Sequence, residues 1–251
     1  MKRSKTALVA VLWMAGAAAA APQETATAES ILDKYVEVTG GKAAYAKVRN
    51  AVLAGRMEFV GKGIKGSLTS YKAGPRKSYE VVEIEGVGKI EQGTDGQVAW
   101  EKSALQGPRI KDGEERALVL RAAAPYPEWR QQFPKVELAG EDTVDGRACH
   151  KLVLTPAEGK PETRWFDKKT GLLVKSAQII KNPMGEIPAE FVPGDYKPVD
   201  GLLLPHRVTQ KAINMEILVV VESVKHNVDL PADRFDLPAD VRALAEKRKK
   251  P

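Results

Sequence analysis

The sequence contains one cysteine, Cys149, and only three histidines. With a single cysteine the chain cannot form an internal disulfide bond, so burial of apolar side chains must hold the fold. The spacings Cys-x-x-Cys and His-Glu-x-x-His are absent, and so are a Gly-x-Ser-x-Gly elbow and a phosphate-binding glycine loop. These absences argue against a zinc, redox-thiol, serine-nucleophile or nucleotide site.

The remaining reactive side chains do not form a recognisable catalytic group. Cys149 and His150 are neighbours on a predicted strand, so they point to opposite faces and cannot act as a pair. We expect a buried Cys149, a His150 at the surface or at the lip of the fold, no cofactor and no metal, and we expect that the protein is not an enzyme. A hydrolase built from scattered residues is the alternative, and His150, His206 and Glu141 are the residues to change in testing it.

The N-terminus resembles an export signal. Lys2, Arg3 and Lys5 precede an apolar stretch, 6–20, that is short and rich in small residues. Ala18 to Ala20 fits the small-x-small cleavage rule, so residues 1–20 are predicted to be a signal peptide and the protein to be periplasmic. A retained N-terminal anchor helix is the alternative. A lipid-modified start would need a cysteine at the cleavage site, and none is there.

The charge of the chain does not suit nucleic acid. Three of the six net positive charges lie in the export signal, which leaves +3 on the rest. Residues 21–251 are predicted to form one domain with a short basic C-terminal tail, and the chain is expected to be a monomer. The tail, 247–250, is expected to be solvated, with contact to an anionic membrane or an acidic partner as the alternative.

Strand-like segments separated by tight turns dominate the rest. Asp95-Gly96, Asp145-Gly146 and Asp200-Gly201 are typical of turns between antiparallel strands, and Gly171 suits the end of a longer turn. About ten strands are predicted, together with helices over 29–38, 42–48, 114–123, 128–133 and 241–249. This pattern predicts an α+β fold in which a large, strongly curved antiparallel sheet is covered on its concave side by the helices near 31–48 and 114–133.

Five segments in order resemble the LolA-like periplasmic lipoprotein carriers and the related outer-membrane lipoprotein-sorting proteins. They are Thr94–Trp100, Trp165–Leu172, Asp195-Tyr196, Asp200–Pro205 and Phe235–Pro238. The resemblance implies an unclosed β-barrel with helices over its mouth and a hydrophobic cavity for lipoprotein acyl chains or free lipid. It also implies transient membrane contact, an inner-membrane releasing complex that supplies cargo, and an outer-membrane receptor that takes it.

One position departs from the family pattern. The carriers have an arginine directly before a proline after the first hairpin, where it helps to hold the lid shut. The matching proline here is Pro75, which Gly74 precedes and Arg76 follows. The lid function of that arginine has therefore shifted to Arg76 or is absent.

Apolar strand faces supply the candidate lipid-binding residues, which are Leu53, Met57, Phe59, Tyr79, Val98, Trp100, Met215, Ile217 and Val219. Leu118, Leu120 and Trp129 are the candidate lid residues. Burial of an acyl chain is worth about 0.8 kcal/mol per methylene, so apolar walls and a removable cover suffice for such a site. The alternatives are that the same residues fill an ordinary core and that the lid is a plain packed helix.

A second function uses the same fold. The chain could be a lipid-responsive periplasmic sensor or adaptor that binds an envelope protein. A stable protein partner, with lipoprotein sorting unchanged on deletion, would distinguish it from a carrier.

Overall fold

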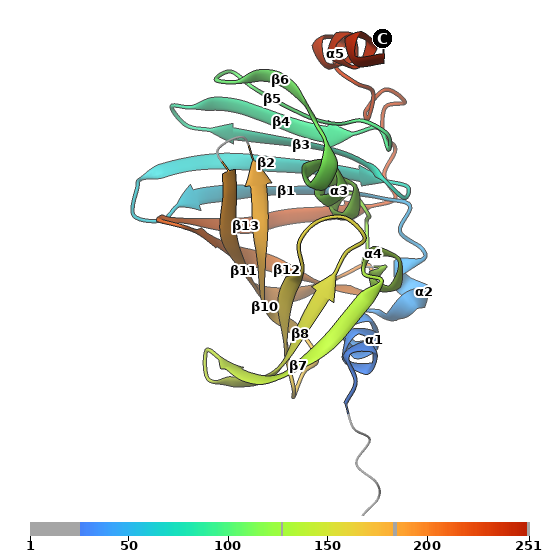
Figure 1. The fold of residues 1–251 in the computed structure, drawn as a ribbon, viewed down its shortest axis with the longest axis vertical. Coiled ribbons are helices and arrows are strands. Elements are labelled where there is room, and N and C mark those ends of the chain that lie inside the picture. Colours follow the sequence, from blue (N-terminus) through green and yellow to red (C-terminus); the bar gives the residue numbers. More distant parts are fainter. Residues whose placement is uncertain (1–25, 127, 183–184, 250–251) are drawn as a thin grey trace, which may run out of the picture.

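The computed structural model describes residues 26–126, 128–182 and 185–249. Within them the chain forms one sheet of 13 antiparallel strands (Figure 1). In chain order the strands are β1 Asn50–Phe59, β2 Ile64–Ala73, β3 Lys77–Ile84, β4 Gly88–Thr94, β5 Ala99–Ser103, β6 Gly107–Lys111, β7 Lys135–Val144, β8 Arg147–Thr155, β9 Glu162–Asp167, β10 Leu173–Asn182, β11 Gly185–Val199, β12 Leu202–Ala212 and β13 Met215–His226.

The chain runs through the sheet as two meanders that meet in the middle. From β1 it proceeds strand by strand to the edge strand β6, crosses to the opposite edge strand β7, and returns to β13, which pairs with β1. The sheet curls but does not close, because β6 and β7 pair only with β5 and β8 (Figure 1). The predicted unclosed β-barrel of the α+β class is confirmed.

Short polar turns fix the pairing. Asp167 ends β9, and its Oδ1 accepts hydrogen bonds from the backbone N–H groups of Lys169 and Thr170, both at 2.8 Å. Gly171 then adopts a φ of 74°, which glycine reaches without a steric penalty. Antiparallel strands joined in this way need no helical crossover.

Five helices accompany the sheet, namely α1 Ala28–Val38, α2 Gly41–Tyr45, α3 Gly113–Ala122, α4 Trp129–Gln132 and α5 Ala239–Lys249. Thr27 and Ser30 form a reciprocal capping box at the start of α1. Helices α1 to α4 lie along the open side of the curled sheet, and α5 lies beyond β6 (Figure 1). The predicted cover of the concave side by the first four helices is therefore confirmed.

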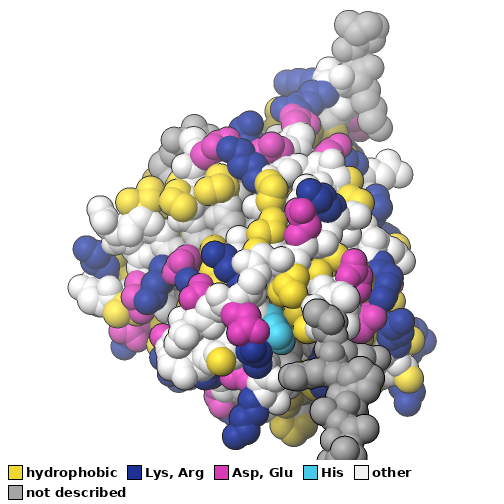
Figure 2. All heavy atoms as spheres, turned by 60° about the horizontal axis from the view of Figure 1, so that its bottom comes forward, with side chains coloured by type: hydrophobic (Ala, Val, Ile, Leu, Met, Phe, Trp, Pro, Cys, Tyr) yellow, Lys and Arg dark blue, Asp and Glu magenta, His cyan; other side chains and the backbone are white. Residues whose placement is uncertain are grey.

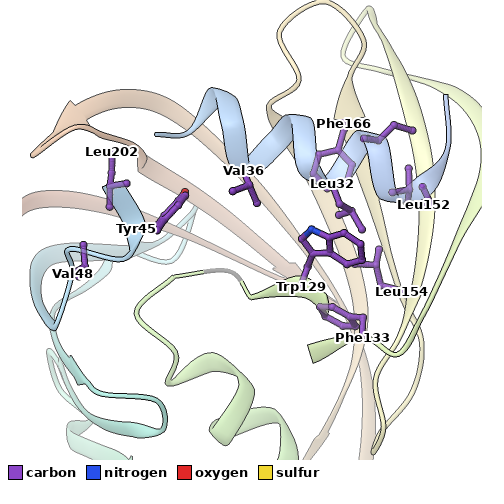
Figure 3. Packing of buried hydrophobic residues seen from close by; sticks show 12 residues of the cluster. Leu32, Val36, Tyr45, Val48, Trp129, Phe133, Leu152, Leu154, Phe166 and Leu202 are labelled. Atoms are coloured by element: carbon purple, nitrogen blue, oxygen red, sulfur yellow. The ribbon is translucent and has the colours of Figure 1, made fainter. Parts of the chain in front are cut away.

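The main hydrophobic core lies where α1 meets strands β8, β9 and β12. Ile31, Leu32 and Val36 of α1 are buried against sheet residues, and Tyr45, Val48, Trp129 and Phe133 belong to the same cluster (Figure 3). The sheet contributes Leu152, Leu154, Phe166 and Leu202. This end of the concave face is consequently filled by the protein's own side chains.

The predicted signal peptide, 1–20, lies outside the described residues, and so does Lys250 of the basic tail. Among the described residues, no helix is long and apolar enough to cross a membrane.

Candidate functional site

The two faces of the sheet are distinguished by what covers them. Side chains alternate between faces along a strand, so the register assigns each residue to one face. Lys72 of β2 and Arg109 of β6 reach α3, and Phe166 of β9 packs under α1. We call the face that carries these residues the inner face and the opposite one the outer face.

Much of the inner face is apolar and only half-buried. Three rows of cross-strand partners run through β1: Phe59 pairs with Ile217 and Ile64, Met57 with Val219 and Gly66, and Gly55 with Val221 and Leu68. The half-buried members of these rows and their continuation onto β3, β11 and β12 form what we call the inner apolar surface, namely Met57, Phe59, Ile64, Leu68, Val82, Ile84, Phe191, Val208 and Val219. Figure 2 shows hydrophobic side chains gathered in a band between charged ones.

Six of the nine predicted lipid-binding residues come together on this face. Leu53, Met57 and Phe59 project from β1, and Met215, Ile217 and Val219 project from the adjacent strand β13. Ile217 is buried, whereas Met215 is 42% exposed at the start of its strand. Their role in lipid binding stays a prediction, but the shared surface that it requires is present.

The other three predicted residues lie elsewhere. Tyr79 pairs with Gly93, which pairs with Trp100, and this row lies on the outer face. There the guanidinium of Arg234, from the segment after β13, lies 5.8 Å from the ring centre of Tyr79. Val98 belongs to the turn before β5, where its N–H donates to Asp95 Oδ1. The prediction grouped the three residues with the inner set because it counted aromatic and apolar residues without the register between strands.

Helix α3 covers part of the inner face without burying a residue of its own. Every residue of α3 is at least partly exposed. Polar contacts hold the helix in place: both terminal nitrogens of Arg109 donate to the carboxylate of Glu115, at 2.8 and 3.0 Å, and Lys72 Nζ donates to the Ala122 carbonyl oxygen at 2.6 Å. A covering helix that is attached by a few polar contacts needs much less free energy to open than a helix whose side chains are buried in a core.

The arginine that pairs with this cover is Arg109, not Arg76. Arg76 is exposed in the β2–β3 turn and borders a hollow beside the outward side of α3. Arg109 comes from the edge strand β6, close along the chain to α3. The ion pair that attaches α3 is therefore local to the segment between β6 and β7.

The predicted lid residues have three different positions. Leu118 faces the sheet and borders a hollow of about 250 Å³ beneath α3, together with Phe133 and Phe191. Leu120 borders the hollow on the outward side. Trp129 is 6% exposed in the core, and its indole N–H donates to Asp33 of α1 at 3.3 Å. Of the three, only Leu118 therefore lies between α3 and the inner face.

A larger hollow, of about 650 Å³, lies at β1, β2, β3 and β13 and has a different character. Five charged residues, Arg56, Glu58, Lys65, Glu83 and Glu85, line it together with the apolar Met57, Ile84, Leu218 and Val220. The charged side chains make this hollow less suited to an acyl chain than a purely apolar surface.

The reactive side chains are scattered, as the spacing of the sequence suggests. Cys149 is buried on the outer face with Trp165 and Val174, and burial raises the pKa of its thiol. His150 is on the inner face, where burial lowers its pKa, and buried His206 donates one hydrogen bond from Nδ1 to the Leu204 carbonyl oxygen at 3.0 Å. Among the described residues, no group of three His, Cys, Asp or Glu side chains could hold a metal.

Sequence reasoning missed part of the surface. Val82 and Ile84 are two positions apart in β3 and point to the same, half-buried face. The alternation of apolar and polar residues in the sequence could therefore have identified them. Phe191 lies on the same face as its partner Gln210 of β12, and this pairing between strands could not be read from the sequence. Arg109 was missed because its strand was not predicted.

Replacing Glu115 with glutamine should loosen α3. The variant keeps the side-chain shape but removes one charge from a partly exposed bidentate pair, which is worth about 1–2 kcal/mol. Amide hydrogen exchange across 113–122 should become roughly five- to thirtyfold faster. Glu114→Gln, on the same turn, is the control and should leave exchange unchanged. Equal rates in Glu115→Gln and the unaltered protein would show that the ion pair does not hold the helix.

Solved structures of other proteins have an architecture similar to this one. No protein-family model and no curated protein matches the chain. Solved structures do match: a LolA superfamily protein from Nitrosomonas europaea has a TM-score of 0.59 and 14% identity, covering 85% of this chain and 99% of that one. A DUF1329 family protein from Desulfovibrio piger has a TM-score of 0.57 and 15% identity, covering 84% and 98%.

A third structure has a functional description. A putative outer membrane lipoprotein-sorting protein domain from Vibrio parahaemolyticus has a TM-score of 0.53 and 11% identity, covering 81% of this chain and 96% of that one. Three structures at this coverage share the unclosed, helix-covered sheet described above. The chain therefore has the LolA-like fold.

Proposed function

We propose that the protein is a non-enzymatic periplasmic carrier that holds the acyl chains of lipoproteins or lipids on its inner apolar surface. The observation that carries the proposal is the contrast within the inner face. The end under α1 is filled by buried side chains, whereas the surface around Met57, Phe59 and Val219 is apolar and half-buried. An apolar surface of this kind, inside a curved sheet, suits an apolar ligand.

The cover supports the same function. Helix α3 is held by Arg109–Glu115 and Lys72 rather than by buried apolar residues, so it can move without opening the core. A shuttle between membranes needs both states, one that shields the acyl chain and one that releases it. The resemblance to lipoprotein-sorting proteins suggests the cargo and its donor and acceptor membranes.

The test is direct. The mature protein is purified from its native envelope without detergent, extracted with organic solvent, and the extract is examined by mass spectrometry. We expect acyl lipid in the extract, and we expect the extracted protein to bind a fluorescent fatty acid at about one per chain. Absence of lipid together with absence of binding would overturn the carrier function.

A deletion strain separates carrier from adaptor. Lipoproteins that accumulate in the wrong membrane would support carriage. Correct sorting, with a stable protein partner recovered from the envelope, would support the sensor or adaptor function instead.

A further inference from the structure

The hollow beneath α3 differs in chemistry from the inner apolar surface that it adjoins. Leu118, Phe133 and Phe191 provide apolar contacts, while Arg121 of α3 and Arg164 of β9 bring two guanidinium groups. Ser176, Gln132 and Gln178 add neutral hydrogen-bonding groups to its wall. It is therefore a mixed site, apolar on one side and basic on the other.

Both arginines converge on one aromatic ring. The guanidinium carbon of Arg164 lies 4.9 Å from the ring centre of Phe133, and that of Arg121 lies 5.9 Å from it. Phe133 is only 3% exposed. Its ring holds the two cations near each other through cation–π contacts.

The positive charge of the hollow is only partly compensated. Arg164 forms an ion pair with the buried carboxylate of Glu162. Arg121 donates to the Glu158 carbonyl oxygen at 3.1 Å, and within the described residues it has no carboxylate at ion-pair distance. The residues that line the hollow thus carry a net charge of +1. Burial lowers the pKa of Arg121; the nearby Glu162 carboxylate opposes this shift, and the neighbouring Arg164 adds a smaller lowering.

The hollow is continuous with the inner apolar surface through strand pairing. Arg164 pairs with Ser176, Ser176 with Phe191, and Phe191 with Gln210. The same row continues through Ile217 and Phe59 to Ile64. A single amphiphile can therefore place a charged group beneath α3 and lay its chain along this row.

We propose that Arg121 and Arg164 form a head-group site for an anionic amphiphile, a carboxylate or a phosphate, at the lid end of the inner apolar surface. The proposal rests on the proposed lipid-carrying function and adds the charge of the ligand. Arginine suits this position because its planar fork donates two hydrogen bonds to carboxylate or phosphate oxygens. It also places one of the two contacts on the movable cover, so anion binding holds α3 closed over the ligand.

Competition against a fluorescent fatty acid tests the site with the extracted, full mature chain. The competitors are dodecanoate, dodecyl phosphate, uncharged dodecanol with the same tail length, and inorganic phosphate. We expect both anionic amphiphiles to bind at least tenfold more tightly than dodecanol and inorganic phosphate not to compete at millimolar concentration. If inorganic phosphate were the only competitor to displace the fluorescent fatty acid, the hollow would be an anion site without a lipid function.

Variants separate the head-group site from the apolar surface. Arg121→Gln should remove most of the tenfold preference and leave dodecanol affinity unchanged, since α3 buries no residue whose loss would unfold it. Arg116→Gln is the matched control on the same helix, because Arg116 donates to the Gln97 carbonyl and does not line the hollow. Glu162→Gln should strengthen dodecanoate binding severalfold by freeing Arg164.

Because Arg164→Gln would leave the buried Glu162 carboxylate unpaired, the second arginine is tested in the double variant Glu162→Gln, Arg164→Gln. We expect this variant to bind dodecanol normally and to have lost the anionic preference. Equal affinity of the unaltered protein for dodecanoate and dodecanol would overturn the head-group site while leaving the carrier intact. Failure of every amphiphile, dodecanol included, would overturn the carrier function itself.

Discussion

Changing Val219 to aspartate should reduce fatty-acid affinity by a factor of about 30 or more. Val219 lies on the inner face of β13, between Met57 of β1 and Val208 of β12, at the centre of the inner apolar surface. A carboxylate there would have to lie against the acyl chain without a polar partner, which costs about 2 kcal/mol or more. Affinity is measured by titration of a fluorescent fatty acid.

Val220→Asp provides the matched control for this change. Val220 is the next residue of the same strand and is likewise half-buried, but it faces outward and pairs with Arg56 and Arg207. The fatty-acid affinity of Val220→Asp should stay within about a factor of two of the affinity of the unaltered protein. Thermal unfolding of both variants checks that each is folded. Similar affinities for the two aspartate variants would locate the lipid site somewhere other than the inner face.

Phe166→Ala should cost about 3–5 kcal/mol of unfolding free energy, a large share of the roughly 5–15 kcal/mol typical of a folded domain. Phe166 is fully buried and meets the ring of Tyr35 edge-on, with ring centres 5.4 Å apart. Removing its ring leaves a cavity that α1 and β8 cannot close, because both are held by neighbouring core residues. Urea unfolding, followed by tryptophan fluorescence, measures the loss.

Phe59→Ala removes the same ring from the half-buried part of the inner face and is the informative comparison. It should cost under about 1.5 kcal/mol, because a ring already in contact with solvent leaves little new cavity. Its fatty-acid affinity should fall even so. Equal destabilisation by the two changes would mean that the inner face is one continuous core, and the lipid surface would then not exist.

The sequence predicted the fold better than the site. Tight Asp-Gly turns and alternating segments predicted most strands, because those signals act over a few residues. Strand β6 was missed because Pro108 argues against a strand, although proline is tolerated in an edge strand whose N–H side is unpaired. The prediction of about ten strands was therefore low.

The site depends on information that no single segment carries. Tyr79 and Trp100 look equivalent to Phe59 in sequence, and only the register across five strands places them on the outer face. Arg121 and Arg164 are 43 positions apart in the sequence and meet at Phe133 only after the chain has crossed from one edge of the sheet to the other. Local periodicity cannot anticipate either arrangement.

The segment between β6 and β7 spans the gap between the two sheet edges, so its contour length limits how far they can separate. The ten residues of α3 extend about 15 Å as a helix and about 33 Å when extended. Unwinding this one helix would release about 18 Å of chain without breaking a single strand pair. The two sheet edges could then move apart while the sheet stays intact, which would admit a bulkier ligand under the proposed carrier function.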